Sequence, residues 1–140
     1  RIFFDGNWEF KTKYAEDFFQ ESVSLFKNQN IEINDRISIN KYPDINYLGL
    51  STYRTYSDRE LPLEKPEVPC ESIQTIGLSW GYNRMEKYSE ENGKNLYKKY
   101  LIIKDLEGKL LINFGPDSNG EIQELEYRGI QDFIELKKEH

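Results

Sequence analysis

Apolar and polar positions along the chain predict short buried strands that alternate with amphipathic helices. Short apolar runs closed by turn residues predict strands, and these lie at residues 2–4, 31–33, 73–80 and 110–114. Apolar residues three to five positions apart, with charged residues between them, predict helices at 11–29, 89–106 and from 122 to the basic end at 137–138. This alternation indicates an α/β fold with a parallel sheet, and the number of units fits roughly half of a (β/α)8 TIM barrel.

Local signals define the ends of these elements. Ser89 is placed to cap the second helix, Gly93 weakens its first turns, and Gly108 ends it. Residues 37–69 are rich in turn residues and prolines, so we expect a long irregular connection with a brief strand around 47–53. Connections of this length are usually functional.

The composition bounds the number of domains and the classes of function. A chain of 140 residues with 37% hydrophobic and 14% aromatic residues can form one folded domain or one part of a larger domain. The net charge of −6 argues against the basic surface that nucleic acid or anionic lipid requires, and the longest apolar stretch, 100–103, is too short to span a membrane. The chain opens in a strand-like run without a signal peptide, so we expect a piece of a longer polypeptide.

The single cysteine and the single histidine exclude several kinds of active site. Cys70 has no cysteine partner and no basic cluster around it, so we expect a structural thiol. The histidine, His140, is the last residue. A Ser/His/Asp triad, a Cys/His pair and a histidine-based metal site are therefore excluded within this chain. Acid and base chemistry is left to carboxylates, Lys and Tyr.

Charged and aromatic residues follow three of the predicted strands. Asp5 follows the first, Asp35 and Arg36 follow the second, and Trp80 ends the strand at 73–80. Taken alone, Asp5 is typical of a turn, and Asp35 with Arg36 is typical of a local ion pair. Because the carboxyl ends of parallel strands meet at one edge, we expect these groups to converge. A carboxylate, a guanidinium and an indole on one rim favour a sugar site.

The sequence around these residues resembles the α-L-fucosidases of glycoside hydrolase family 29. The similar runs are residues 4–8, 34–36, 71 with 75–83, and 110–116 with 119–120. Their order and spacing resemble the C-terminal half of the family's catalytic barrel over essentially all 140 residues, which implies that the first four βα units are absent. Phe3 stands where many members have Trp, and residues 107–109 differ from the usual Gly-Gly-Asn, so the chain resembles a divergent member.

The resemblance implies roles for three residues. Asp5 matches the nucleophile of the family, which forms a covalent glycosyl intermediate in a retaining mechanism. Arg36 matches an arginine that contacts the sugar, and Trp80 matches an aromatic residue beside the methyl group of fucose.

The general acid/base stays open among several glutamates. Thr52 stands where some members have Glu, and a threonine cannot supply this proton. Glu71 matches the glutamate of a Trp-Glu motif, although Cys70 precedes it here, and strand capping or pairing with a lysine explains it equally well. Three further candidates lie in the long connection: Glu60, Glu64 and Glu67. If Glu71 is the acid/base, its carboxyl is expected about 5 to 5.5 Å from that of Asp5.

The resemblance implies that residues 1–140 form a single partial catalytic domain of a retaining α-L-fucosidase. Such an enzyme removes terminal α-L-fucose from fucosylated glycans without a metal or organic cofactor. The alternative, favoured by Thr52, is a non-catalytic fucosidase-like scaffold or a carbohydrate-binding fragment. A half-barrel exposes an edge strand and apolar helix faces, so we expect a homo-oligomer or a missing N-terminal half. The resemblance also implies a secreted, periplasmic or lysosomal location.

Overall fold

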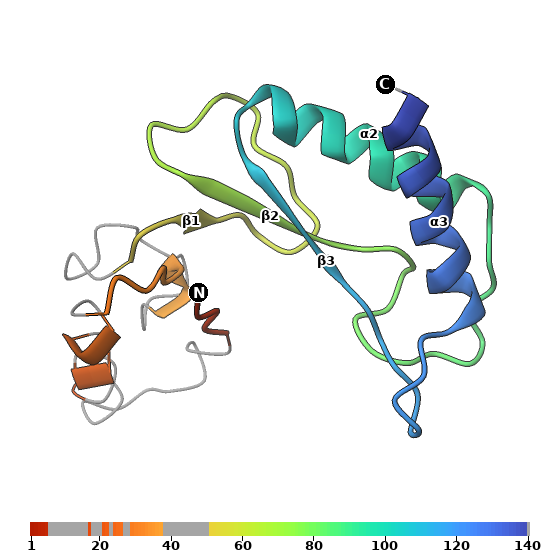
Figure 1. Ribbon diagram of the computed structural model, residues 1–140, viewed down its shortest axis with the longest axis horizontal. Coiled ribbons are helices and arrows are strands. Elements are labelled where there is room, and N and C mark those ends of the chain that lie inside the picture. Colours follow the sequence, from red (N-terminus) through yellow and green to blue (C-terminus); the bar gives the residue numbers. More distant parts are fainter. Residues whose placement is uncertain (6–16, 18–20, 23, 27–28, 38–50, 140) are drawn as a thin grey trace. The chain divides into compact units, whose positions relative to one another are not determined.

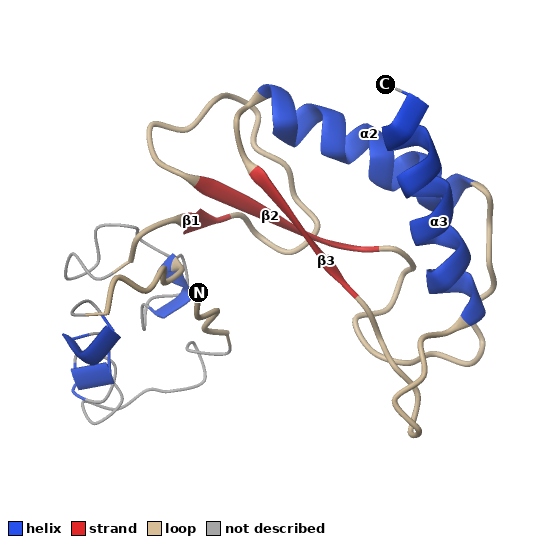
Figure 2. Cartoon of the chain, in the orientation of Figure 1, coloured by secondary structure: helices blue, strands red, loops and turns tan. Residues whose placement is uncertain are grey.

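The structure is a computed structural model that describes residues 1–5, 17, 21–22, 24–26, 29–37 and 51–139. The chain divides into two compact units, the first made of Arg1–Thr55 and Pro66–Glu71, the second of Tyr56–Lys65 and Ser72–His140. Figures 1 and 2 show the regular elements, which are η2 (Asp35–Ile37, a 3-10 helix), β1 (Arg54–Thr55), β2 (Cys70–Thr75), α2 (Glu91–Asp105), β3 (Lys109–Asn113) and α3 (Glu124–Glu139). The strands form one sheet in the order β1-β2-β3. Among the described residues, no helix has the length and apolar character needed to cross a bilayer.

In the first unit, extended segments lie side by side in chain order and run parallel. Ile2 forms a parallel bridge with Ile33, and Asn34 forms one with Tyr53. Strand β1 then pairs in parallel with the start of β2, with Thr55 opposite Glu71. The parallel arrangement predicted from the alternating pattern is confirmed for these segments, although the predicted strands at 2–4 and 31–33 are reduced to single bridges.

Two predictions for the first half of the chain fall largely outside the described residues. Within the predicted helix at 11–29, residues 21–22 and 24–26 are helical, and most of the rest is not described. Of the brief strand predicted around 47–53, only the last residues are described, and Tyr53 lies in the bridge to Asn34.

Strand β2 lies earlier in the sequence than its apolar pattern predicts. The prediction was 73–80, whereas the strand runs from Cys70 to Thr75 and all six residues are buried. Four of these residues are polar or charged, so the apolar pattern could not reveal where the strand begins. The buried hydroxyl of Ser72 is satisfied because it donates a hydrogen bond to the carbonyl of Glu60 at 2.6 Å. The strand ends because the hydroxyl of Thr75 donates to the carbonyl of Gly77 at 2.6 Å and turns the chain. Burial raises the pKa of the Cys70 thiol, as expected of a structural cysteine.

The second unit has its core between β3 and the two long helices. Helices α2 and α3 pack against each other (Figure 1), and the buried cluster consists of Ile76, Leu96, Tyr97 and Phe133. Gly93 allows this close packing, because a Cβ there would lie 2.5 Å from the Cβ of Asp132 on α3. The glycine that the sequence marks as a helix weakness is therefore the contact point of two helices.

The ends of α2 differ from the predicted ends by one or two residues. The N-cap position is Glu90 rather than Ser89, although the hydroxyl of Ser89 accepts a hydrogen bond from the amide of Glu91 at 3.3 Å. At the other end, the amide of Gly108 donates to Ile103 at 2.8 Å, and the amide of Glu107 donates to Lys104 at 2.9 Å. This is the Schellman pattern, with Glu107 rather than Gly108 in the left-handed conformation at φ 58°.

We expect Glu107→Gly to raise the free energy of unfolding by about 0.5–1 kcal/mol, because glycine adopts a positive φ without the steric cost of a side chain. Glu107→Ala is the matched control, since both variants lose the exposed ion pair with Lys65 but only glycine relieves the backbone. The measurement is urea denaturation of the three proteins. An alanine variant as stable as the glycine variant would contradict the conformational explanation.

We expect Tyr53 to make stability fall between about pH 10 and pH 12. Its hydroxyl is buried without a hydrogen-bond partner among the described residues, and burial, helped by the charge of Glu71, raises its pKa to about 12. The folded state therefore keeps this proton above the pH at which the unfolded state loses it, so the contribution is complete below about pH 10 and is lost as pH rises towards 12.

The test is denaturation of the protein and of Tyr53→Phe at about pH 8 and about pH 11. Relative to Tyr53→Phe, the unmodified protein should lose stability at the higher pH. Tyr127→Phe, at a tyrosine that is 55% exposed, is the control for a general effect of removing a phenol. If the free energies of unfolding of the unmodified protein and of Tyr53→Phe differ by the same amount at both pH values, Tyr53 does not titrate in this way.

Candidate active site

An ion pair between Asp5 and Arg36 forms the centre of the candidate site. The Nη1 atom of Arg36 lies 2.9 Å from Oδ1 of Asp5, and its Nε atom donates to the hydroxyl of Thr55 at 3.2 Å. The side chain of Arg36 is 7% exposed, whereas that of Asp5 is 57% exposed. Arg36, which is anchored by its hydrogen bond to Thr55, therefore orients the carboxylate of Asp5, which is still accessible to a ligand.

Asn34 fixes the backbone that leads into Asp5. Its side-chain amide accepts a hydrogen bond from the amide of Phe4 at 2.8 Å and donates to the carbonyl of the same residue at 2.9 Å. Asn34 is fully buried, so these two bonds satisfy a side chain that would otherwise be costly to bury. This role of Asn34 in holding the backbone before Asp5 was not predicted from the sequence. The signal that could have revealed it is the position of Asn34 next to charged residues at the end of a predicted strand.

The local ion pair considered for Asp35 and Arg36 is not formed. The carboxylate of Asp35 instead accepts hydrogen bonds from the amide and the hydroxyl of Thr55, at 2.8 and 2.6 Å. Burial raises the pKa of Asp35, while these bonds oppose the shift. Arg36 is thereby left to pair with Asp5, and Thr55, which sequence reasoning missed, connects both charged residues.

Glu71 lies in the same unit and forms an ion pair with Arg1. It is opposite Thr55 in the parallel ladder, and its side chain is only 3% exposed. Burial opposes ionisation of Arg1, but its hydrogen bond to Glu32 and the charge of Glu71 raise its pKa overall. The guanidinium of Arg1 also lies 4.5 Å from the centre of the Tyr53 ring. Glu71 is thus a buried carboxylate one ladder position from the Arg36 network, paired with an arginine rather than a lysine.

The other residues considered for the acid/base role have different surroundings. Thr52 is used for structure, since its hydroxyl accepts from the amide of Ile33 at 2.7 Å and donates to the carbonyl of Ile33 at 3.0 Å. The three remaining glutamates, Glu60, Glu64 and Glu67, are all exposed. Glu71 is therefore the one buried carboxylate among these candidates.

Trp80 belongs to the second unit, where two contacts fix it. Its carbonyl accepts a hydrogen bond from the side chain of Asn113 at 2.6 Å, and the guanidinium of Arg59 lies 5.0 Å from the centre of its ring. The residue keeps 37% of its surface exposed. Arg59, at φ 64°, was not identified from the sequence, because no local motif links it to a residue 21 positions later.

A close backbone contact explains two of the sequence runs noted above. A Cβ on Gly115 would lie 2.7 Å from the amide nitrogen of Tyr82, so only glycine allows the chain after β3 to pass the loop that carries Trp80. The amide of Gly115 donates to the buried carboxylate of Glu126 on α3 at 2.8 Å. Within the described ranges, no group of three His, Cys, Asp or Glu side chains is arranged to hold a metal ion.

Comparison with solved structures shows the same fold in bacterial α-L-fucosidases. The chain matches unliganded α-L-fucosidase AlfC from Lactobacillus casei with a TM-score of 0.69 and 22% identity, over 89% of this chain and 36% of that chain. It matches a bacterial fucosidase with a triazole-bearing pyrrolidine inhibitor with a TM-score of 0.77 and 18% identity, over 97% and 33% of the two chains. For α-L-fucosidase isoenzyme 1 from Paenibacillus thiaminolyticus, the TM-score is 0.67, the identity 21% and the coverage 96% and 34%.

The chain therefore spans about a third of the length of these enzymes. No curated protein sequence matches it. The family model described as alpha-L-fucosidase matches residues 1–135, which include all four residues considered for the site. Because that match extends over nearly the whole chain, the chain belongs to the α-L-fucosidase family.

Proposed function

We propose that this chain is the part of a retaining α-L-fucosidase that carries the nucleophile, Asp5. The observation that supports this most is the ion pair in which buried Arg36 orients the exposed carboxylate of Asp5. A nucleophilic carboxylate must be held in a fixed orientation while one face stays open to the sugar, and an ion pair between a buried guanidinium and an exposed carboxylate is suited to this role. The proposal includes membership of glycoside hydrolase family 29 and terminal α-L-fucose on glycans as substrate.

The proposed reaction has two displacements. In the first, the carboxylate of Asp5 attacks the anomeric carbon, the bond to the aglycone oxygen breaks, and an acid protonates that oxygen. In the second, the same group removes a proton from water, which attacks the anomeric carbon and releases Asp5 and fucose with retained configuration. We assign the acid/base role to Glu71, because it is the buried carboxylate opposite Thr55, which itself bonds to Arg36.

The ion pair with Arg1 constrains this assignment. A general acid must hold a proton before the first displacement, whereas a neighbouring guanidinium favours a carboxylate. Glu71 must therefore exchange its contact with Arg1 for one with the aglycone oxygen when substrate binds.

The proposal also covers the organisation of the catalytic barrel. Residues 1–140 are taken as the last half of a (β/α)8 TIM barrel and as one part of a catalytic domain, to which Arg36 and Trp80 contribute sugar contacts. The remaining strands come from a longer chain or, failing that, from a second copy. The experiments below therefore use the complete protein.

We expect Asp5→Gly to lower turnover of an activated aryl α-L-fucoside at least about 1,000-fold, because no nucleophile remains. Azide fits the space left by the side chain, attacks the anomeric carbon as the aryloxide leaves, and restores part of the rate. The product should be β-fucosyl azide, since one displacement replaces two. Rate measurements with and without azide, together with NMR of the product, check this.

Asp5→Asn is the matched control, because it removes the charge but leaves no space for azide. Unchanged hydrolysis by Asp5→Gly would exclude Asp5 as the nucleophile while leaving the family assignment intact. If the unmodified protein binds fucose but never hydrolyses an activated fucoside, the non-catalytic alternative replaces the proposal.

We expect Glu71→Gln to slow hydrolysis of a fucoside with a poor leaving group far more than that of a nitrophenyl fucoside. A good leaving group departs without protonation, so its first displacement needs no acid. The comparison is kcat/KM for the two substrates in Glu71→Gln and in the same substitution at Glu60, Glu64 and Glu67. An equal loss of kcat/KM on both substrates would show that Glu71 has only a structural role. A loss confined to the substrate with the poor leaving group in the variant of Glu60, Glu64 or Glu67 would assign the acid role to that residue.

A further inference from the structure

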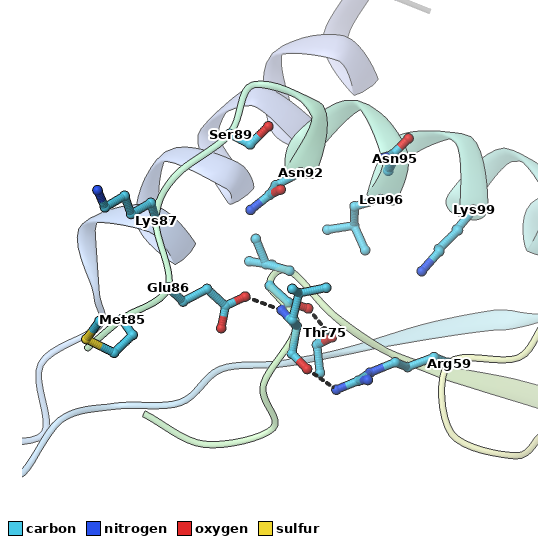
Figure 3. Close-up of a pocket in the computed structure, with 13 residues that line it drawn as sticks. Arg59, Thr75, Met85, Glu86, Lys87, Ser89, Asn92, Asn95, Leu96 and Lys99 are labelled. Atoms are coloured by element: carbon cyan, nitrogen blue, oxygen red, sulfur yellow. Dashed lines mark hydrogen bonds between the residues drawn. The ribbon is translucent and has the colours of Figure 1, made fainter. Parts of the chain in front are cut away.

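The second unit contains a cavity of about 620 Å³ between the end of β2, the loop after it and the first half of α2 (Figure 3). None of the four residues considered for the active site lines it. The side chains that matter for its chemistry are Arg59, Glu86, Asn92, Asn95 and Lys99. Its volume is in the range of small-molecule sites, so it can hold more than a water cluster.

Two cations from different parts of the chain converge on this cavity. Arg59 is anchored by its amide, which donates to the carbonyl of Ile73 at 3.0 Å, and its Nη2 atom donates to the carbonyl of Leu78 at 2.5 Å. Lys99 on α2 donates from Nζ to the side-chain oxygen of Gln74 at 2.6 Å. Gln74 is fully buried, so the ammonium group of Lys99 is drawn inward towards the sheet.

Neither cation is neutralised by the surrounding protein. Both donate to neutral oxygens, and Arg59 also lies over the ring of Trp80. Within the described part of the chain, no carboxylate oxygen lies within 4.0 Å of either charge. Burial lowers the pKa of Lys99, and the positive charge of Arg59 lowers it further. Two like charges facing one partly buried space cost free energy that an anion would recover.

The one acid in the cavity wall is used to hold the loop. The Oε1 atom of Glu86 accepts a hydrogen bond from the amide of Leu78, and a Cβ on Gly77 would collide with this carboxylate. Figure 3 shows Glu86 and Arg59 meeting the same short stretch of backbone from opposite sides. Because Glu86 bonds to the loop, it does not neutralise Lys99. The amide groups of Asn92 and Asn95 lie on the same helix as Lys99 and line the same wall of the cavity.

We propose that this cavity binds an oxyanion group, a phosphate or a sulfate, between Arg59 and Lys99. The guanidinium supplies directed donors and the ammonium a point charge, which together match a tetrahedral oxyanion. The asparagine amides on α2 supply further donors without adding charge. The volume exceeds that of one such ion, so the group fits either as a free ion or as an ester on a larger molecule. The argument for this site does not rest on the proposed fucosidase activity, although Arg59 also contacts the ring of Trp80.

The test is isothermal titration of the complete protein with inorganic phosphate and with sulfate, in sodium chloride at matched ionic strength. Lys99→Gln keeps a hydrogen-bond donor near Gln74 but removes the charge, and we expect it to weaken phosphate binding at least about tenfold. Lys98→Gln, at the exposed neighbouring position on α2, makes the same change of charge away from the cavity and should leave the affinity unchanged. Lys99→Arg keeps the charge and should retain binding.

Several outcomes would overturn the site. One is that phosphate and sulfate give no more heat of binding than chloride. Another is that Lys98→Gln and Lys99→Gln weaken phosphate binding equally. A third is that a Lys99→Gln variant with native circular dichroism binds phosphate with unchanged affinity. Phenyl phosphate separates the two possible sources. Tighter binding of the ester supports a larger ligand, and preference for the inorganic ion supports a free anion. Activity on fucosides is not used as a readout, so failure here leaves the proposed function untouched.

Discussion

The buried guanidinium of Arg36 is the constraint on which the candidate site depends. A buried guanidinium needs partners to offset the loss of water, and Asp5 and Thr55 are two of those that position Arg36. Arg36 and these two partners lie on three separate segments of the chain that run side by side in parallel. Asn34 completes the arrangement by holding the backbone before Asp5, and the order Ile2, Ile33, then Tyr53 follows from the same parallel contacts. One charged side chain thus ties the placement of the nucleophile to the packing of the strand segments.

The second unit depends on a different constraint, the close approach of backbones. Gly93 lets α2 meet α3, and Gly115 lets the chain after β3 pass the loop at Gly81 and Tyr82. The position of Trp80 follows from this loop together with Arg59. Glycines here serve packing rather than flexibility, because a side chain at these positions would lie within 3 Å of atoms that cannot move away. The runs of residues that resemble the family motifs are therefore explained partly by steric fit and not only by chemistry.

Several elements could be predicted from the sequence because their signals are local. The helices α2 and α3 and the strand β3 lie within one or two residues of their predicted positions, since amphipathic spacing and turn residues determine them. The start of strand β2 could not be predicted, because Glu71, Ser72 and Gln74 are buried and have partners distant in the sequence. The end of α2 at Glu107 was missed for another reason. Its left-handed conformation is imposed by the backbone bonds of the helix end rather than by its own preference.

The sequence by itself determined the alternation of strands and helices, the exclusion of histidine and cysteine chemistry, and the candidates Asp5, Arg36, Glu71 and Trp80. The alternation and the exclusion rest on residue identity and on spacing within one element, which do not depend on the rest of the fold. The four candidates rest on the resemblance to the α-L-fucosidase family and, for Asp5, Arg36 and Trp80, also on their places at the ends of predicted strands. Only the tertiary structure decided that Arg36 pairs with Asp5 rather than with Asp35, and that Arg1 pairs with Glu71. The physical reason is that a charged side chain selects its partner by distance and burial, and both are properties of segments brought together from far apart in the chain.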